Sequence, residues 1–290
     1  MSESINLLEV AKHDWWDYKQ LFPFIVQIGT GGTGGYTVHH IAQLLGTSQS
    51  PAAYVIADPD VIEQKNLGNQ LFLPQEVGLK KADVLARRYS AAYGLDIGSF
   101  SDSFIESPEH LKSLFSTEYM RTQINGDNTL VLPIIIGTVD NNYSRRIMYE
   151  LFRSLRTCVY IDAGNESTVV PHDWQTRSKN DWTEEELAAY QESGWSGQVV
   201  IGVKANLFNQ PAVAEVFPDI LTDTDEIRPS ELSCSELSAS EPQRLIVNKF
   251  AALSIANIVN TIVEEKKINS HITFFHVRKN YMRATEIKRK

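Results

Sequence analysis

The chain has 290 residues, of which 42% are hydrophobic and 22% are charged, as in ordinary globular proteins that hold one large α/β domain or one domain with an appended lobe. A net charge of -9 argues against non-specific nucleic-acid binding, because such binding needs a basic surface that displaces counterions. The N-terminal residues lack the pattern of a signal peptide, no run of about 18 apolar residues predicts a membrane span, and two cysteines fit a reducing compartment, so we expect a cytoplasmic protein.

The N-terminal half predicts alternating strands and helices. Residues 22–28 (FPFIVQI) form a short apolar run typical of a buried parallel strand, and the glycine cluster GTGGTGG follows directly. Residues 37–46 have apolar side chains at helical spacing and end at Gly46. Residues 52–58 predict a second buried strand. Strand, glycine turn, helix and strand make a βαβ unit with a right-handed crossover.

The later elements extend this pattern and then depart from it. Helices are predicted over 80–94 and 145–155, and strands over 130–137, 158–163 and 197–204. A polar segment from residue 166 to 195 carries three tryptophans and predicts a short helix over 183–194. Residues 205–236 show no clear periodicity, and loops that long are often functional. Residues 243–265 predict the strongest amphipathic helix of the chain, and 272–277 with 281–287 predict a hairpin.

These elements predict a Rossmann-like α/β fold. We expect a largely parallel sheet flanked by helices, with a long crossover loop and a C-terminal antiparallel hairpin. The whole chain, residues 1–290, is expected to form a single domain. Its expected parts are a nucleotide-binding core (22–163), an insertion (166–196), the crossover loop (205–236) and a C-terminal helix and hairpin (241–290).

The glycine cluster is the first candidate binding element. Gly29, Gly31 and Gly34 have the spacing of dinucleotide-binding turns, and Gly32 is an additional glycine between them. Glycines at the start of a helix let backbone N–H groups approach a phosphate, although a purely structural turn has the same composition. Asp58 ends the second strand, where a carboxylate can bind ribose hydroxyls or begin an Asp-Pro-Asp turn. To this point the pattern fits NAD and ATP equally.

The segment that follows, residues 58–82 (DPDVIEQKNLGNQLFLPQEVGLKKA), resembles the ubiquitin-activating-enzyme superfamily, which includes the bacterial ThiF, MoeB and HesA adenylyltransferases. The family pattern D-x-D, N-L-x-R-Q and G-x-x-K-A is matched by Asp58, Asp60, Asn66, Leu67, Gln70, Gly78, Lys81 and Ala82. Its T-D-N-x-x-x-R element is matched by Asp140, Asn141 and Arg145. Three further segments are most similar to the ThiF-type proteins of the bacterial PRTRC system: GTGGTG, YIDAGN with the later GQVVIG, and SCSELSASEPQRLIVNKFAA.

The resemblance implies ATP- and Mg²⁺-dependent adenylation of the C-terminal carboxylate of a ubiquitin-like protein, a sulfur-carrier protein or a peptide, by a homodimer. Lys81 would neutralise the phosphates, although a solvated lysine at a helix start is the ordinary alternative and Lys80 adjoins it. Asp140 would hold Mg²⁺ or, alternatively, cap the following helix. Asn66 and Gln70 would donate and accept neutral hydrogen bonds at the nucleotide.

One residue departs from the family pattern. Asn69 stands at the nucleotide site where the family has arginine, and an amide cannot replace a charged bidentate group. A nucleotide-binding pseudo-enzyme or scaffold subunit is therefore the alternative, and an NAD-dependent oxidoreductase a third.

Cys234, just before the last long helix, matches the family cysteine that forms a thioester with the carrier. An inert cysteine in a loop is the alternative interpretation. Cys158 opens a buried strand and is expected to pack there, and the zinc-binding CxxC pairs of ThiF and MoeB are absent.

Overall fold

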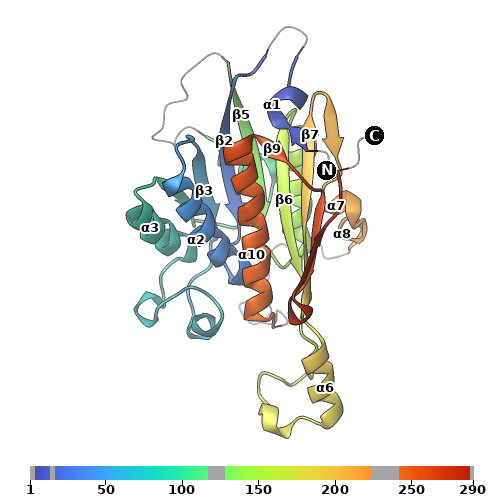
Figure 1. The fold of residues 1–290 in the computed structure, drawn as a ribbon. Coiled ribbons are helices and arrows are strands. Elements are labelled where there is room, and N and C mark those ends of the chain that lie inside the picture. Colours follow the sequence, from blue (N-terminus) through green and yellow to red (C-terminus); the bar gives the residue numbers. More distant parts are fainter. Residues whose placement is uncertain (1–3, 14–16, 117–127, 224–241, 288–290) are drawn as a thin grey trace.

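The computed structural model of the chain describes residues 4–13, 17–116, 128–223 and 242–287. Its main sheet has the strand order β11-β10-β7-β6-β5-β2-β3-β4, with β8 paired to β7 (Figure 1). The strands are β2 (Gln20–Ile28), β3 (Ala53–Ala57), β4 (Ile97–Phe100), β5 (Thr129–Gly137), β6 (Cys158–Asn165), β7 (Ser196–Ala205), β8 (Phe208–Gln210), β10 (Ile272–His276) and β11 (Tyr281–Ala284). Strands β2 to β6 pair in parallel, and the others pair antiparallel. The predicted fold class and the C-terminal hairpin are confirmed.

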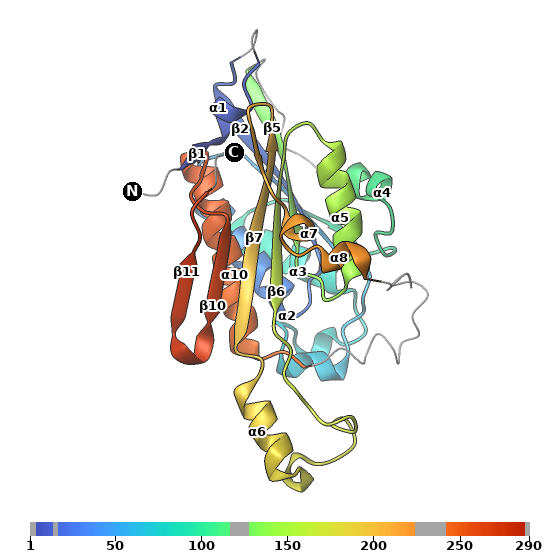
Figure 2. The ribbon, with the colours of Figure 1, turned by 90° about the vertical axis from the view of Figure 1, so that its right-hand side faces the viewer.

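Helices cover both faces of this sheet, as Figure 2 shows. One face carries α2 (Gly32–Thr47), α3 (Lys81–Tyr93) and α10 (Leu245–Asn260); the other carries α4 (Pro108–Ser113), α5 (Asn142–Ser154), α7 (Val213–Val216) and α8 (Asp219–Thr222). Alternate residues of a strand point to opposite faces, so Leu21 and Ile25 of β2 pack under the first layer while Phe22 and Phe24 pack under the second. Burial on both faces explains the nearly continuous apolar runs of the central strands.

Two small units lie outside these layers. Near the N-terminus, β1 (Ile5–Asn6) pairs with β9 (Lys267–Ile268) and leads into α1 (Leu7–Val10). The segment between β6 and β7 forms a lobe with α6 (Glu184–Glu192), which projects beyond the carboxyl end of β6 (Figures 1 and 2). Thr183 and Glu186 cap α6 reciprocally, which stabilises a helix that has few tertiary contacts.

Helix boundaries differ from those expected at the glycine and asparagine turns. Helix α2 begins at Gly32 rather than at residue 37, because the glycine cluster itself forms the first helical turn, with Gly35 N donating to the Gly31 carbonyl at 2.9 Å. Helix α5 begins at Asn142 rather than at Arg145. Apolar periodicity does not detect a helical turn made of glycine or polar residues, so both beginnings are earlier than predicted.

The segment after β7 contains short elements that its sequence did not predict. Strand β8 and helices α7 and α8 occupy most of residues 208–222. Each is only one turn or one short strand long, which is too short for a periodic pattern. The following residues, including Cys234, lie outside the described part of the chain.

Helix α10 is apolar around most of its surface rather than amphipathic as predicted, with Leu245, Ile246 and Leu253 exposed. By length and composition, Leu245–Glu265, with a mean hydropathy of 1.5, could cross a membrane. However, 61% of the apolar stretch within this segment is buried in the fold, where α10 packs on α2, β6 and β7. A core helix between a sheet and a neighbouring helix has this composition for packing reasons alone.

Candidate functional site

The glycine turn lies where the strand order of the sheet reverses. From β2 the chain moves outward through β3 and β4 and then returns to β5 on the other side of β2. Ile28 at the end of β2 is opposite Gly137 at the end of β5, so the segments that follow these strands are neighbours. Ligands of open α/β sheets bind outside the carboxyl ends of the strands at such a reversal. The glycine turn and the segment containing Asp140 therefore meet at the edge where a ligand is expected.

The backbone of the turn requires glycine. Gly29 has a φ of 91°, and a Cβ there would lie 2.7 Å from the carbonyl oxygen of Thr138. A Cβ on Gly34 would lie 2.8 Å from the carbonyl carbon of Gly29. Gly31, the N-cap of α2, has no side chain to accept a hydrogen bond from the first N–H groups of the helix. The turn thus presents an uncapped helix N-terminus, which is an anion-binding arrangement.

Asp58 holds this turn in place. Its Oδ2 accepts hydrogen bonds from Thr30 N (2.7 Å) and Thr30 Oγ1 (2.8 Å), and its Oδ1 accepts one from Asp60 N (2.9 Å). Asp58 is buried, and burial raises its pKa, although the charge of Lys81 opposes this shift. A carboxylate has about four lone-pair sites, so the three bonds within the chain leave one for a ribose hydroxyl. The bond from Asp60 N closes the Asp-Pro-Asp turn that was the alternative interpretation, whereas the sequence did not indicate that Asp58 also orders the glycine turn through Thr30.

A second buried network supports the turn from β2. Gln27 is fully buried, and its Nε2 donates to the carbonyl oxygens of Gly29 (2.9 Å) and Gly34 (3.0 Å). Its Oε1 accepts a hydrogen bond from the Tyr54 hydroxyl at 2.5 Å. Buried polar groups are nearly always hydrogen-bonded, so a glutamine next to the glycine turn in the otherwise apolar run of residues 22–28 was the available signal. Gln27 is therefore a residue of the site that the motifs did not predict.

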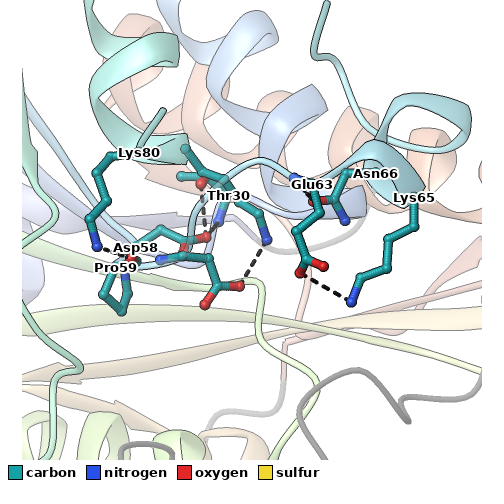
Figure 3. Close-up of polar contacts among 9 residues, drawn as sticks. Thr30, Asp58, Pro59, Glu63, Lys65, Asn66 and Lys80 are labelled. Atoms are coloured by element: carbon teal, nitrogen blue, oxygen red, sulfur yellow. Dashed lines mark hydrogen bonds and ion pairs between the residues drawn. The ribbon is translucent and has the colours of Figure 1, made fainter. Parts of the chain in front are cut away.

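Lys81 is a buried cation at the start of α3. Its Nζ lies 2.8 Å from Asp60 Oδ2, and the exposed fractions of the two side chains are 8% and 44%. Burial acts to lower the pKa of Lys81, but the charges of Asp58 and Asp60 outweigh it and raise that pKa above its ordinary value. Lys80 instead donates from Nζ to the carbonyl oxygen of Pro59 at 2.5 Å (Figure 3). Lys81 is thus a fixed ammonium group, and its exposed partner Asp60 can yield to a phosphate.

The three candidate amides in the next turn have different surroundings. Asn66 is buried, and its Oδ1 accepts a hydrogen bond from Glu63 N at 2.9 Å, which closes the 3-10 turn Gln64–Gly68. Gln70 lies over the glycine turn, with its Nε2 3.8 Å from the position of a Cβ on Gly31. Its Oε1 is buried and has no hydrogen-bond partner within the described structure. Asn69 is exposed and lines a cavity beside α10. Of the three, Gln70 has the free polar atom nearest the turn.

Asp140 is exposed at the same edge, three residues after β5. Its alternative function, capping α5, belongs instead to Asn141, whose Oδ1 accepts a hydrogen bond from Ser144 N at 2.8 Å. Arg145 fixes the segment from behind: it donates to Asp162 Oδ1 (3.0 Å) and to the carbonyl oxygen of the residue before Asp140 (2.8 Å). Arg145 thus pairs within the fold, and Asp140 remains exposed.

The donor set fits a metal ion shared with a ligand. Among the described residues, no three His, Cys, Asp or Glu side chains are grouped closely enough to hold a metal by themselves. Mg²⁺ is commonly held by one or two carboxylates together with phosphate oxygens and water, and Asp140 is suited to that arrangement. Cys234 lies outside the described residues. Cys158 is buried in β6, where burial raises the pKa of its thiol, as expected for a packing residue.

Helix α10 contributes a residue that sequence reasoning missed. Asn248 is 2% exposed, and its Oδ1 accepts hydrogen bonds from Thr33 Oγ1 (3.1 Å) and Asn165 Nδ2 (2.8 Å). With that oxygen occupied, its side-chain nitrogen is directed at Gly32, where a Cβ would collide with it. The helix therefore brings a hydrogen-bond donor to the first turn of α2. Nothing in the local sequence distinguishes Asn248 from the other two asparagines of α10, so the sequence did not reveal it.

Comparison with known proteins identifies the fold but not a family. No protein-family model matches the sequence, and no curated protein matches it significantly. Among solved structures, PaaA matches with a TM-score of 0.56 at 14% identity, covering 92% of this chain and 65% of that one. The microcin C7 biosynthetic enzyme MccB in complex with N-formylated MccA matches with a TM-score of 0.55 at 16% identity, covering 92% and 65%.

Escherichia coli MccB with ATP also matches, with a TM-score of 0.53 at 16% identity, covering 92% of this chain and 64% of that one. The chain thus spans less than two thirds of the length of these solved chains. At such low identity a structural match establishes the arrangement of helices and strands, and not the chemistry. The chain has the Rossmann-like α/β fold of PaaA and MccB.

Proposed function

We propose that this chain is an ATP- and Mg²⁺-dependent adenylating enzyme of the ubiquitin-activating-enzyme superfamily, acting on the C-terminal carboxylate of a peptide or of a ubiquitin-like or sulfur-carrier protein. The observation that carries the proposal is the convergence of three groups at the strand reversal. These are the uncapped glycine turn before α2, the buried Lys81 with its exposed partner Asp60, and the exposed Asp140. A helix N-terminus, a fixed cation and a free carboxylate are what a nucleoside triphosphate with its magnesium ion requires.

In the proposed reaction, a carboxylate oxygen of the acceptor attacks the α-phosphorus of ATP. A new P–O bond forms to the acyl group, the bond to pyrophosphate breaks, and the acyl adenylate and pyrophosphate result. The reactants are both anions, so positioning and charge neutralisation supply most of the rate enhancement. Lys81 stays protonated and positively charged at neutral pH, because the charges of Asp58 and Asp60 raise its pKa.

The magnesium ion, when bound, neutralises phosphate charge, and Asp140 is the residue that would hold it. Gln70, with a free buried oxygen over the turn, and Asn248, with a side-chain nitrogen directed at Gly32, would orient the nucleotide by hydrogen bonds. Asp58 would accept one bond from ribose while it orders the turn. Two solved structures of the same fold support this proposal, since MccB is known with ATP and with N-formylated MccA.

Finer assignments form part of the same proposal. Similarity in the GTGGTG, YIDAGN and SCSELSASEPQRLIVNKFAA segments favours the ThiF-type proteins of the PRTRC system within the superfamily. A homodimer is expected from the resemblance and a cytoplasmic location from the composition, and light scattering of the purified protein would measure the mass of the oligomer. A thioester on Cys234 would appear as an acceptor adduct that hydroxylamine releases and Cys234→Ala abolishes. Cys158 cannot substitute, because it is buried and its thiol pKa is raised.

Exchange of radiolabelled pyrophosphate into ATP, in the presence of candidate carriers and peptides, tests the function. Lys81→Met removes a charged contact worth roughly 1.5–3 kcal/mol, so exchange should fall about tenfold to a hundredfold. The exposed Lys112 of α4 is the matched control, and Lys112→Met should exchange normally. Absence of ATP binding by calorimetry in the wild-type protein would contradict the proposal.

Asp140→Asn tests the metal carboxylate separately. Exchange should fall at a fixed Mg²⁺ concentration and recover in part as Mg²⁺ is raised, because the amide is a weaker donor. The control is Asp181→Asn, an exposed aspartate of the lobe that holds α6. Equal Mg²⁺ dependence in Asp140→Asn and wild type would remove Asp140 from the metal site.

A nucleotide-binding subunit without adenylating activity is the second candidate, and the uncharged, exposed Asn69 favours it. Replacing Asn69 with arginine discriminates between the two. An enzyme limited by the missing charge should gain exchange activity, whereas a scaffold should bind ATP more tightly without exchange. Calorimetry with NAD in place of ATP tests the oxidoreductase alternative.

A further inference from the structure

A cavity of about 390 Å³ opens beside the start of α10. Its walls come from the end of α6 and the residue before β7, from the first turns of α10, and from the turn after Asn66. The lining residues are Asn69, Tyr190, Trp195, Gln243, Arg244, Leu245, Ile246 and Lys249. Both α6 and the start of α10 lie at the end of the molecule toward which β2 runs (Figure 1). The volume falls in the range of about 300–1,000 Å³ that is typical of ligand sites.

The cavity is cationic on an acidic chain. Arg244 and Lys249 line it and no aspartate or glutamate does, whereas the whole chain has a net charge of -9. Arg244 donates to the carbonyl oxygens of Ser193 (3.0 Å) and Tyr190 (2.5 Å), which are neutral groups that leave its charge uncancelled. No carboxylate of the described residues forms an ion pair with either cation. An anionic ligand would therefore complement this surface.

Arg244 is also held in a fixed orientation. Its guanidinium lies 4.7 Å from the ring centroid of Tyr190 and 3.9 Å from that of Trp195, in cation–π geometry. Its two hydrogen bonds to carbonyl oxygens fix the same group from the side. A guanidinium immobilised in this way loses little conformational entropy when it binds a carboxylate. The arrangement suits recognition of an acidic side chain better than attachment of a mobile counterion.

Apart from the amides of Asn69 and Gln243, the remaining walls are formed by two aliphatic and two aromatic residues. Leu245 and Ile246 are 36% and 42% exposed, although they begin a helix that is largely apolar. The rings of Tyr190 and Trp195 continue this surface. A ligand that fills the cavity must therefore carry an apolar group beside its anionic group.

The cavity adjoins the proposed nucleotide site through α10. Asn248 contacts Gly32 and Thr33 in the first turn of α2. The next residue, Lys249, lines the cavity and has its Nζ 5.2 Å from the ring centroid of Tyr36 on α2. Asn69 lines the cavity, and the adjacent Gln70 lies over the glycine turn. A chain that ends at the nucleotide would thus pass the cavity a few residues before its end.

We infer that this cavity selects the acceptor, and that the acceptor carries an acidic residue next to an apolar residue shortly before its terminal carboxylate. The inference rests on the proposed function and specifies its substrate. Arg244 and Lys249 bind the acidic side chain, and the apolar side chain packs on Leu245, Ile246 and Trp195. A tail of two glycines has no side chain that could fill this volume, so such a tail alone does not satisfy the site.

Fluorescence anisotropy with a set of short labelled peptides tests the inference. The peptides have free carboxyl ends and a leucine, and they differ at one neighbouring position, which is glutamate, glutamine or lysine. The glutamate peptide should bind the wild-type protein about tenfold more tightly than the glutamine peptide, as expected for roughly 1.4 kcal/mol of charge-assisted bonding. Lys249→Glu should reverse the order and favour the lysine peptide. Lys279→Glu, at an exposed position of the C-terminal hairpin, should leave the order unchanged.

Two assays on the same variants separate this inference from the proposed function. Calorimetry measures ATP binding, and pyrophosphate exchange measures adenylation. Exchange supported equally by all three peptides would overturn the inference and leave the function standing. Preference for the glutamate peptide without exchange would contradict the function and support the cavity as an acidic-peptide site. If Lys249→Glu weakens ATP binding and not peptide binding, the cation serves the nucleotide and the inference fails. Lys249→Gln, which adds no negative charge, repeats each measurement should Lys249→Glu unfold.

Discussion

Replacing Asp58 with asparagine is the sharpest test of how the glycine turn is held. In the native structure the carboxylate accepts hydrogen bonds from Thr30 N, Thr30 Oγ1 and Asp60 N, at 2.7, 2.8 and 2.9 Å. Asparagine has the same shape but only one acceptor oxygen. If that oxygen serves Thr30, the NH₂ group faces the N–H of Asp60, so two donors oppose each other in a buried place.

The size of the effect comes from these contacts. Loss of one hydrogen bond to a buried charged group costs about 1.5–3 kcal/mol. The substitution also relieves the desolvation of a buried carboxylate, which is what raises the pKa of Asp58. The two effects oppose each other, so we expect the free energy of unfolding to fall by about 1.5 kcal/mol, the lower end of the range. ATP affinity should fall as well, because the turn that presents the α2 N-terminus is less ordered.

Urea denaturation at neutral pH measures this change. Repeating the denaturation with saturating ATP measures how much bound ATP adds to the free energy of unfolding. In the wild-type protein, ATP at about a hundred times its Kd should add about 2.7 kcal/mol. The added stability should be smaller in Asp58→Asn at the same ATP concentration. Unfolding free energies within about 0.5 kcal/mol of each other, together with an equal ATP effect, would refute the assigned role of Asp58.

Two further substitutions test the packing of the site. Gly34→Ala places a Cβ 2.8 Å from a backbone carbon of Gly29. It should lower the free energy of unfolding by about 1–3 kcal/mol and abolish ATP binding. Gly68→Ala is the control: a Cβ there has nothing within 4 Å, so urea denaturation and ATP binding should be unchanged. Arg145→Met leaves the buried Asp162 without its cation and should cost about 3–5 kcal/mol in urea denaturation. Burial already raises the pKa of Asp162 above 3.8, and Arg145 opposes that shift. Loss of the arginine raises this pKa further. The difference in the free energy of unfolding between the wild type and the variant should therefore grow as pH increases above 3.8. If this difference shrinks with increasing pH, Arg145 does not stabilise the charged form of Asp162.

Local signals in the sequence were sufficient for the main elements. The apolar run before the glycine cluster predicted β2, and the spacing of apolar residues predicted α3, β5 and β6 within a few residues. The predicted glycine turn and Asp140 lie at one edge because parallel strands place their carboxyl ends together. The short elements β8, α7 and α8 were not predicted, since each has too few residues for a periodic pattern.

The resemblance to adenylating enzymes singled out Asp58, Asp60 and Lys81, but it could not say which atoms are engaged by the chain itself. Most of the Asp58 carboxylate orders Thr30 and Asp60, and the Asn66 side chain closes its own 3-10 turn. These partners depend on the path of a loop, and the same residues in another loop would have other partners. Residue type therefore identified candidates, and only geometry separated ordering roles from free donors and acceptors.

The sequence by itself determined the layers of the fold and the position of the glycine turn, because strand burial and helical spacing are properties of neighbouring residues. Only the tertiary structure brought Asn248 to Gly32, and Arg244 and Lys249 to the cavity beside Asn69. More than 170 residues of chain separate Asn69 from Arg244. Contacts across such a distance follow from how α10 packs on α2, which is decided by the summed burial of both helices and leaves no local pattern in the sequence.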